Sequence, residues 1–153
     1  MRKRNPHKKM ISNVKRTIGT KKYRRTQRKD GSVPPLPKDY IETRLEIDYI
    51  FVEQLLAKQN GRCYWFPEID LTEYFDCLWI PKHPMAPSVD RLNSKVTETD
   101  GHYSPDNVVL TTRFVNFGRC DYGGDFHNEV VMPFKEAILN PSNIVVGLED
   151  YFG

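Results

Sequence analysis

Residues 87–119 read PSVDRLNSKVTETDGHYSPDNVVLTTRFVNFGR, and this stretch decides the fold that we expect for the chain. Its β-branched runs, separated by polar and turn-forming residues, predict four elements. In chain order these are a short strand, a polar loop, a second strand and a short helix, at residues 88–92, 93–106, 108–111 and 112–118. Thr111 or Thr112 can cap the helix, because a threonine hydroxyl accepts a hydrogen bond from a free amide of the first turn.

Two side chains of this stretch can offer oxygen ligands to one cation. Asp90 lies in the first expected strand and Asn116 on the expected helix, so packing of the helix on the strands brings them together. Mg²⁺ often takes only one or two protein ligands and keeps water and substrate phosphate in its other positions. A cation held in this way polarises a phosphodiester and stabilises the departing alkoxide. By residue type alone, however, Asp and Asn near strand ends are more often turn and capping residues.

The motifs around these residues resemble an HNH endonuclease of the His-Me finger (ββα-metal) superfamily, in the small form common in phages and mobile elements. The resemblance covers roughly residues 54–119 and rests on the runs QNGRCY, PSVDRL, GHYSPDNVVL and FVNFGR, at 59–64, 87–92, 101–110 and 114–119. Its most specific parts are the strand–loop–strand–helix order and the spacing of nine positions from Asn107 to Asn116. It implies a small α+β domain, in which a ββα-metal finger is flanked by helices and a β-hairpin.

The resemblance also implies a role for each matched residue. Asp90 matches the family's metal-binding aspartate, and Asn116 matches the metal-binding His or Asn of the helix. Asn107 matches the asparagine that braces the loop between the strands. The implied activity is hydrolysis of phosphodiester bonds in DNA with one Mg²⁺ or Mn²⁺ ion, as in a homing, recombination or packaging-type nuclease of a phage.

The chain departs from the family at the general base, a histidine directly after the aspartate, because Arg91 stands at that position. Arginine stays protonated and cannot take a proton from water. Three interpretations remain open: His102 or His83 acts as the base from another backbone position, metal-bound water supplies the nucleophile without an imidazole, or the domain binds DNA without cutting it. A base contributes roughly 10²–10⁴-fold to the rate, so its loss would slow the reaction without necessarily abolishing it. Because both proposed metal ligands are present, we expect activity to be retained.

Arg91 is then expected to hold a non-bridging oxygen of the scissile phosphate, and His102 is the favoured candidate for the base. A structural ion pair with a nearby acid is the alternative for Arg91, and an exposed loop position is the alternative for His102. The main rival function is a catalytically weak or inactive HNH-fold protein that binds nucleic acid, such as a viral accessory factor. Resolution of branched DNA would share the chemistry and differ only in the shape of the substrate.

Charge is strongly segregated along the chain. The 153 residues carry a formal net charge of +3, but residues 1–31 hold 13 Lys and Arg against one Asp. This segment has few apolar residues, so we expect a disordered arm whose cations bind nucleic-acid phosphates. A solvated tail or a localisation signal is the alternative. The residues expected to contact nucleic acid are Lys8, Lys9, Lys15, Arg16, Lys21, Lys22, Arg24, Arg25, Arg28 and Lys29.

The remaining organisation follows from local patterns. The Pro-rich segment 32–39 is expected to link the arm to an HNH-like nuclease domain at 40–153, whose motif core is 87–119. Asn60-Gly61 supplies a left-handed stop after the first helix of that domain. The other expected elements are a helix, two paired strands and an amphipathic segment interrupted at Pro133, at 40–59, 63–66, 77–80 and 126–139.

Composition excludes several classes of protein. No stretch approaches the roughly 18 apolar residues that cross a bilayer, and no apolar core follows the basic N-terminus, so we expect neither a membrane protein nor a secretory signal. We expect a cytoplasmic protein, in the host cell if it is phage-encoded. No cysteine lies in a C-x-x-C pair, so no zinc is expected. Three cysteines are expected as core residues, and four aromatic residues are expected more in the core than on bases: Cys63, Cys77, Cys120, Tyr64, Trp65, Phe66 and Trp79.

Overall fold

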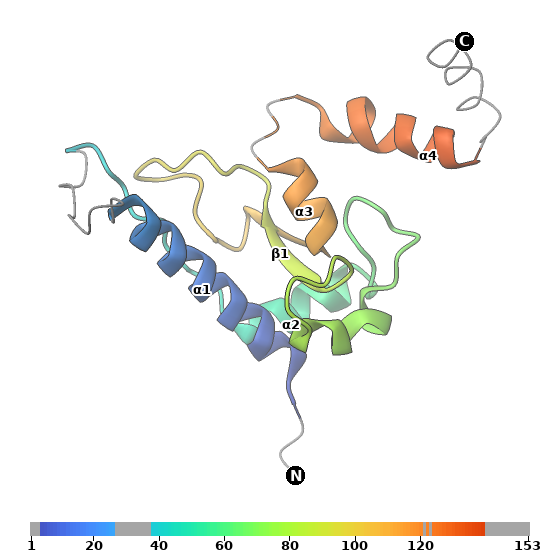
Figure 1. Cartoon of the computed structure of the whole chain (residues 1–153), viewed down its shortest axis with the longest axis horizontal. Coiled ribbons are helices and arrows are strands. Elements are labelled where there is room, and N and C mark those ends of the chain that lie inside the picture. The colour runs from blue at the N-terminus through green and yellow to red at the C-terminus, as the bar shows by residue number, and fades with distance from the viewer. Residues whose placement is uncertain (1–3, 27–37, 121, 123, 140–153) are drawn as a thin grey trace. The chain divides into compact units, whose positions relative to one another are not determined.

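The structure is a computed structural model, and it describes residues 4–26, 38–120, 122 and 124–139. The described elements are α1 (Pro6–Thr26), α2 (Tyr49–Lys58), the 3₁₀-helix η1 (Leu71–Trp79), β1 (Pro87–Arg91), β2 (Val108–Thr112), α3 (Arg113–Arg119), the π-helix η2 (His127–Val131) and α4 (Met132–Leu139). Figure 1 labels the main helices and β1 along the chain. This mixture of helices with a two-stranded antiparallel sheet is a small α+β fold, as the sequence predicts. The chain divides into two compact units, Met1–Asp121 and Tyr122–Gly153.

The sheet is a pair of buried strands that carries the site. β1 and β2 run antiparallel, with Pro87 opposite Thr112 at one end and Arg91 opposite Val108 at the other. Four of the five β2 side chains are β-branched, and all five are buried, as suits a strand covered on both faces. The strand–loop–strand–helix order predicted for this stretch is confirmed, with ends shifted by one residue.

Helix α3 follows β2 without a loop. The Thr112 hydroxyl caps it by accepting a hydrogen bond from the Val115 amide, at 3.3 Å between oxygen and nitrogen, so one of the two predicted caps is confirmed. α3 packs against both β1 and β2. This packing brings the helix residues over the strand that carries Asp90.

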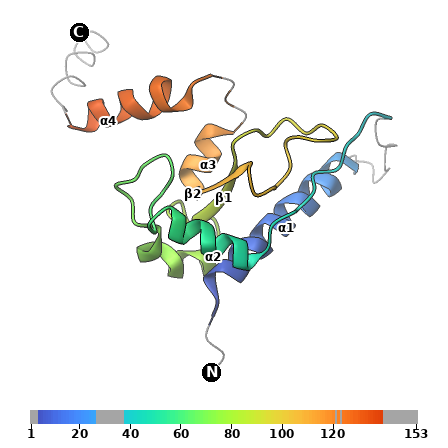
Figure 2. The ribbon, with the colours of Figure 1, turned by 180° about the vertical axis from the view of Figure 1, so that it is seen from behind.

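The expectation of a disordered arm is wrong for Pro6–Thr26, which forms helix α1. Met10, Ile11 and Val14 are buried in the core, and Ile18 packs against it partly buried. These apolar residues recur at helical spacing, but they are few among many cations, so composition concealed the pattern. α1 packs against α2, η1 and β1, and Figure 2 shows it beside α2 and β1 from behind. Most of the expected linker, 32–37, lies outside the described residues.

Helix α2 begins at Tyr49, whereas the sequence predicts a start at residue 40. The Asp48 carboxylate caps the helix by accepting a hydrogen bond from the Phe51 amide at 2.8 Å, which satisfies a free donor of the first turn. The preceding residues are extended and pair with the loop after β1, since the Glu46 amide donates to the Tyr103 carbonyl at 2.9 Å. The predicted stop is confirmed, because Asn60 and Gly61 have φ angles of 53° and 73°.

The predicted strand pair at 63–66 and 77–80 is wrong, since both segments are described and neither contains a strand. The second segment falls at the end of η1. Asp70 starts this 3₁₀-helix, because its carboxylate accepts hydrogen bonds from the amide and the hydroxyl of Thr72 at 2.9 and 2.6 Å. A capped helix satisfies its first free amides locally, so the apolar run that follows is held in a helix instead of a strand.

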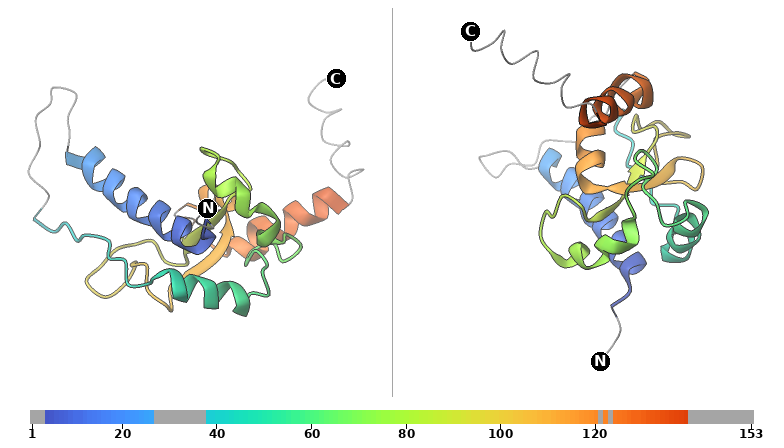
Figure 3. Two further views of the ribbon diagram at one scale, coloured as in Figure 1. Left: turned by 90° about the horizontal axis from the view of Figure 1, so that it is seen from below. Right: turned by 90° about the vertical axis from the view of Figure 1, so that its right-hand side faces the viewer.

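One hydrophobic core joins the helices and strands of the first unit. α1 lies beside β1 and α2 beside β2, as Figure 3 shows from two sides. Trp65, Phe66 and Trp79 pack partly buried against the core, as predicted, whereas Tyr64 is exposed. Of the three cysteines expected in the core, Cys63 is buried, Cys77 is half-buried and Cys120 is exposed. The buried core residues are Met10, Ile11, Val14, Ile47, Val52, Leu56, Cys63, Leu71, Leu78, Val89, Tyr103, Val108 and Leu110.

The second unit contains η2 and α4. The amphipathic segment predicted at 126–139 is helical from Phe126 to Leu139, and its irregularity is the π-helical turn that directly precedes α4. Pro133, the second residue of α4, has no amide hydrogen to donate, so a widened turn before it loses little hydrogen bonding. None of the helices in the described part of the chain is long and apolar enough to cross a membrane.

Candidate functional site

A pocket of about 300 Å³ lies in the first unit, between α1, β1 and α3. Asp90 and Asn116, the two expected metal ligands, both line it, and so does Arg91. Two further cations, Arg16 of α1 and Arg113 of α3, belong to the same lining. The fold therefore gathers one carboxylate, two amides (Asn116 and Asn13 of α1) and three guanidinium groups from three elements around one space.

Asn116 is oriented by β1. Its Nδ2 donates hydrogen bonds to the Ser88 hydroxyl at 2.8 Å and to the Val89 carbonyl at 3.1 Å. Because a carbonyl only accepts, the amide nitrogen must face β1. Among the described residues no group donates to Asn116 Oδ1, so this oxygen is available to a ligand.

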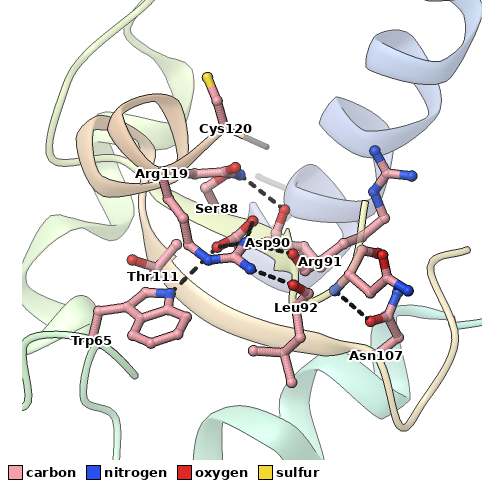
Figure 4. Close-up of polar contacts among 12 residues, drawn as sticks. Trp65, Ser88, Asp90, Arg91, Leu92, Asn107, Thr111, Arg119 and Cys120 are labelled. Carbon is pink, nitrogen blue, oxygen red and sulfur yellow. Dashed lines mark hydrogen bonds and ion pairs between the residues drawn. The ribbon is translucent and has the colours of Figure 1, made fainter. Parts of the chain in front are cut away.

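Asp90 is a buried carboxylate with a cation already beside it. Its side chain is 5% exposed, and Nη1 of Arg119 lies 3.2 Å from both of its oxygens. The indole nitrogen of Trp65 donates to Asp90 Oδ2 at 3.3 Å (Figure 4). Burial raises the pKa of Asp90, because the penalty on the charged form exceeds the stabilisation by Arg119 and Trp65.

Arg119 is a residue that the sequence interpretation missed. Besides pairing with Asp90, its guanidinium donates to the Arg91 carbonyl at 2.6 Å and to the Leu92 carbonyl (Figure 4). It also lies over the Trp65 ring, 5.2 Å from the centroid. Arg119 follows Asn116 by three positions on the same helix, a spacing that makes neighbours on a helix surface. A basic residue one turn after the proposed ligand was the signal that could have found it.

Arg91 faces the loop that joins the strands. Its Nη1 donates to the Gly101 carbonyl at 2.5 Å, and the guanidinium lies 4.9 Å from the centre of the Tyr103 ring. Burial raises the pKa of Tyr103, and the charge of Arg91 opposes that shift. No ion pair of Arg91 with an acid occurs among the residues that the structure describes, so the interpretation as an ion pair has no support here.

Asn107 holds the same loop closed. Its Oδ1 accepts a hydrogen bond from the Asn93 amide, and its Nδ2 donates to the carbonyls of Asn93 and His102, all at 2.8 Å. Gly101 makes the tight part of the loop possible, because its φ is +76° and an added Cβ would lie 2.2 Å from the Lys95 carbonyl oxygen. Asn107 itself does not line the pocket.

His102 is placed away from the pocket. It is 1% exposed, so it is not on the surface of the loop, and it does not belong to the pocket lining. Its Nδ1 accepts a hydrogen bond from the Arg44 amide at 3.1 Å. His83, the other candidate, accepts at Nδ1 from the Met85 amide at 3.2 Å and also lies outside the lining. No described histidine lines this pocket.

Of the residues expected to contact nucleic acid, the structure describes the side chains of four. Lys8 and Lys15 are exposed on α1, and the ammonium of Lys8 lies 4.6 Å from the centre of the Tyr49 ring. Arg16 is exposed and lines the pocket, whereas Lys9 is half-buried. The remaining expected contacts lie in the part of α1 for which only the backbone is described, or beyond it: Lys21, Lys22, Arg24, Arg25, Arg28 and Lys29.

The oxygen donors at the pocket are few. Within the described ranges no group of three or more His, Cys, Asp and Glu side chains could hold a metal. Asp90 and Asn116 offer one carboxylate and one amide oxygen, and Mg²⁺ accepts a set this small when water and phosphate complete its shell. A structural zinc ion would need about four ligands, mostly sulfur and nitrogen.

Comparison with family models, with curated proteins and with solved structures found no match to this chain. The function is therefore inferred from the pocket itself. The pocket is distinguished by the acid–amide pair and the surrounding arginines. Arg119 lies outside the lining and holds the acid with a buried guanidinium.

Proposed function

We propose that the chain is a metal-dependent endonuclease that hydrolyses phosphodiester bonds in DNA, with Asp90 and Asn116 as the ligands of one Mg²⁺ or Mn²⁺ ion. The observation that carries the proposal is that this acid–amide pair shares one pocket with Arg16 and Arg113. Hard oxygen ligands select a hard cation, and guanidinium groups bind phosphate oxygens in a two-pronged geometry. A phosphate of the DNA backbone can bind both the metal ion and the arginines of this lining.

Arg119 already provides the positive charge beside Asp90 that a metal ion would provide. A buried carboxylate needs a cation beside it, and Arg119 supplies one in this structure. A divalent ion at Asp90 would take over that role, while Arg119 keeps its hydrogen bonds to the backbone at the end of β1. When bound, the ion would supply polarisation of the scissile phosphoryl group.

We assign positioning roles to Arg91 and Asn107. Both hold the loop after β1 through hydrogen bonds to its backbone, and this loop fixes the end of the strand that carries Asp90. We assign no proton transfer to His102, because it is buried and lies outside the pocket lining. Without an imidazole at the pocket, the rate would lose up to the roughly 10²–10⁴-fold that a positioned base contributes.

Helix α1 would guide the nucleic acid. It supplies Arg16 to the pocket and exposes Lys8 and Lys15 on its surface. Contacts of this kind release counterions from the nucleic acid, so they give affinity that is independent of sequence and sensitive to salt. The proposed biological setting is a homing, recombination or packaging-type nuclease of a phage or mobile element.

One rival function has a specific observation in its favour. Asp90 is already paired with Arg119, and no histidine of the described chain lines the pocket. A protein that binds nucleic acid without cutting it would need neither a free carboxylate nor a base. This rival is a catalytically inactive accessory protein that uses the same arginines for phosphate.

A nicking assay on supercoiled plasmid with Mg²⁺, Mn²⁺ or EDTA tests the proposal. We expect nicking with either metal, no nicking in EDTA, and loss of nicking in Asp90→Asn and Asn116→Ala. Asp106→Asn is the matched control, because Asp106 is exposed and lies outside the pocket lining, and it should nick as the wild type does.

His102→Gln should retain nicking if the variant folds, since we assign this residue no role in the reaction. Salt-sensitive binding without nicking under any metal would reject the nuclease and support the rival. Nicking that continues in EDTA would reject the metal ion.

A further inference from the structure

Two large apolar side chains stand exposed on α3, next to the pocket. Phe114 is 63% exposed and Phe117 is 65% exposed. They lie three positions apart, so they are neighbours on the helix surface. Phe117 also belongs to the pocket lining, together with Asn116 from the same helix. An apolar pair so exposed at the rim of a charged pocket marks a binding surface.

The surroundings of this pair select an anionic partner. The guanidinium of Arg113 lies 5.3 Å from the centre of the Phe117 ring, and the exposed Arg16 lines the same pocket. Asp90 is the only acid among the lining residues, and Arg119 neutralises it. The partner therefore needs negative charge for the arginines and flat apolar faces for the two rings.

We propose that Phe114 and Phe117 stack on unpaired bases of the strand whose phosphate enters the pocket, so that the substrate is single-stranded or locally unpaired DNA. Phosphates joined to aromatic bases supply both kinds of contact. A phenyl ring has no hydrogen-bonding group, so it gains by stacking on any base and reads no sequence. In an intact duplex the base faces are already covered by their neighbours, and extrusion of a base costs free energy.

This inference rests on the nucleic-acid partner proposed above, but not on cleavage. Its geometry also relates binding to the reaction. Phe117 is adjacent to Asn116 in the chain, and both line the pocket. A base held by Phe117 would place the neighbouring phosphate near the acid–amide pair, so the rings would set which phosphodiester is cut.

Fluorescence anisotropy in EDTA tests the proposal, because binding is then measured without cleavage. The probes are a labelled single strand and a hairpin duplex of the same composition. The test variant is the double substitution Phe114→Leu with Phe117→Leu, which keeps apolar bulk and removes both rings. Ile50→Ala is the control, since Ile50 is an exposed apolar residue of α2 (48%) outside the pocket.

We expect the double leucine variant to bind the single strand at least about fivefold more weakly, the low end of what one stacked base contributes. Binding to the duplex should change less than about twofold, since phosphate contacts dominate it. The double substitution Phe114→Trp with Phe117→Trp keeps a ring at both positions and should bind the single strand at least as tightly as the wild type does. Ile50→Ala should bind both probes as the wild type does.

Wild-type affinity of the double leucine variant for the single strand would overturn the proposal, and so would an equal loss on both probes. Self-association in sedimentation that is lost in the leucine variant, with unchanged DNA binding, would assign the surface to a second copy of the chain and overturn the proposal. Failure of the nuclease proposal is distinct. Ring-dependent single-strand binding without nicking under any metal rejects cleavage and supports stacking, whereas nicking with ring-independent binding does the reverse.

Discussion

The ion pair of Asp90 and Arg119 is the most consequential contact at the scale of single residues. Both side chains are almost fully buried, at 5% and 8% exposure. Removal of one member of a buried pair is strongly destabilising, because it leaves an uncompensated charge. The stability of the fold and the occupancy of the proposed metal site therefore depend on the same carboxylate.

Arg119→Met should lower the free energy of unfolding by about 3–5 kcal/mol in EDTA. Mn²⁺ or Mg²⁺ should recover part of that loss, because an ion that binds only the folded state stabilises it and would replace the missing positive charge. Thermal melting with and without metal measures the effect. The double variant Asp90→Asn with Arg119→Met lacks the carboxylate at position 90, so metal should not raise its melting temperature. Equal melting of Arg119→Met with and without metal would contradict Asp90 as a ligand.

The sequence predicted that two residues would lie close together, whereas their binding of a metal ion stays a prediction. Asp90 and Asn116 were singled out from their types and spacing, and the fold places both at one pocket. Arg119 was missed because its role depends on the burial of Asp90, which a short motif does not reveal. His102 was chosen because a nearby histidine suggests a base, but the loop turns its ring toward the Arg44 amide, away from the pocket.

At the scale of elements, helix α1 both packs into the hydrophobic core and exposes cations. Its buried side chains include Met10 and Val14, and its exposed side chains include Lys15 and Arg16. Composition weighs all residues of a segment equally, so a few apolar residues at helical spacing were hidden by the charge. Deletion of the segment would therefore remove core as well as cations.

Point substitutions separate the two properties of α1. Met10→Ala should cost about 2–5 kcal/mol of stability, as expected for a large side chain lost from a core. Lys15→Gln should leave the urea unfolding midpoint nearly unchanged. It should also reduce the slope of log K against log salt by about 1 if Lys15 contacts a phosphate. Unchanged unfolding of Met10→Ala would contradict the docking of α1, and an unchanged slope would leave Lys15 as a solvated cation.

The cap of η1 gives a dependence of stability on pH. Hydrogen bonds from the Thr72 hydroxyl and amide lower the pKa of Asp70. A group whose pKa is lower in the folded state contributes stability above its unfolded pKa and loses that contribution as the pH falls through the folded pKa. We therefore expect the wild type to exceed Asp70→Asn in stability at neutral pH, and the difference to shrink below about pH 4. Urea unfolding at several pH values measures it, and a constant difference would contradict the role of the charge.

Elements with local signals were predicted well, and those set by tertiary contacts were not. The two strands, the Thr112 cap of α3 and the Asn60-Gly61 stop follow from neighbouring residues. Residues 40–48 have helical spacing but form no helix, because the Asp48 cap starts α2 later and the Glu46 amide pairs with Tyr103. That pairing joins segments far apart in the sequence, so no local pattern contains it.

At the scale of the whole molecule, the first unit contains both its own hydrophobic core and the pocket. Every core residue of the first unit and every pocket residue lies before Asp121. We therefore expect a chain that ends at Asp121 to melt cooperatively near the wild-type temperature and to retain DNA binding. Circular dichroism and anisotropy measure the two properties. Loss of cooperative melting would show that residues 122–153 contribute to the stability of the first unit.

The contacts of Trp65 give the protein an internal optical probe. Its indole nitrogen bonds the buried acid, and the Arg119 guanidinium lies over its ring, so the emission of this indole depends on what occupies the carboxylate. The chain has two tryptophans, and Trp79→Phe would leave Trp65 as the sole tryptophan. The wavelength and intensity of its emission could then follow the addition of metal or DNA without any label. This readout does not depend on cleavage.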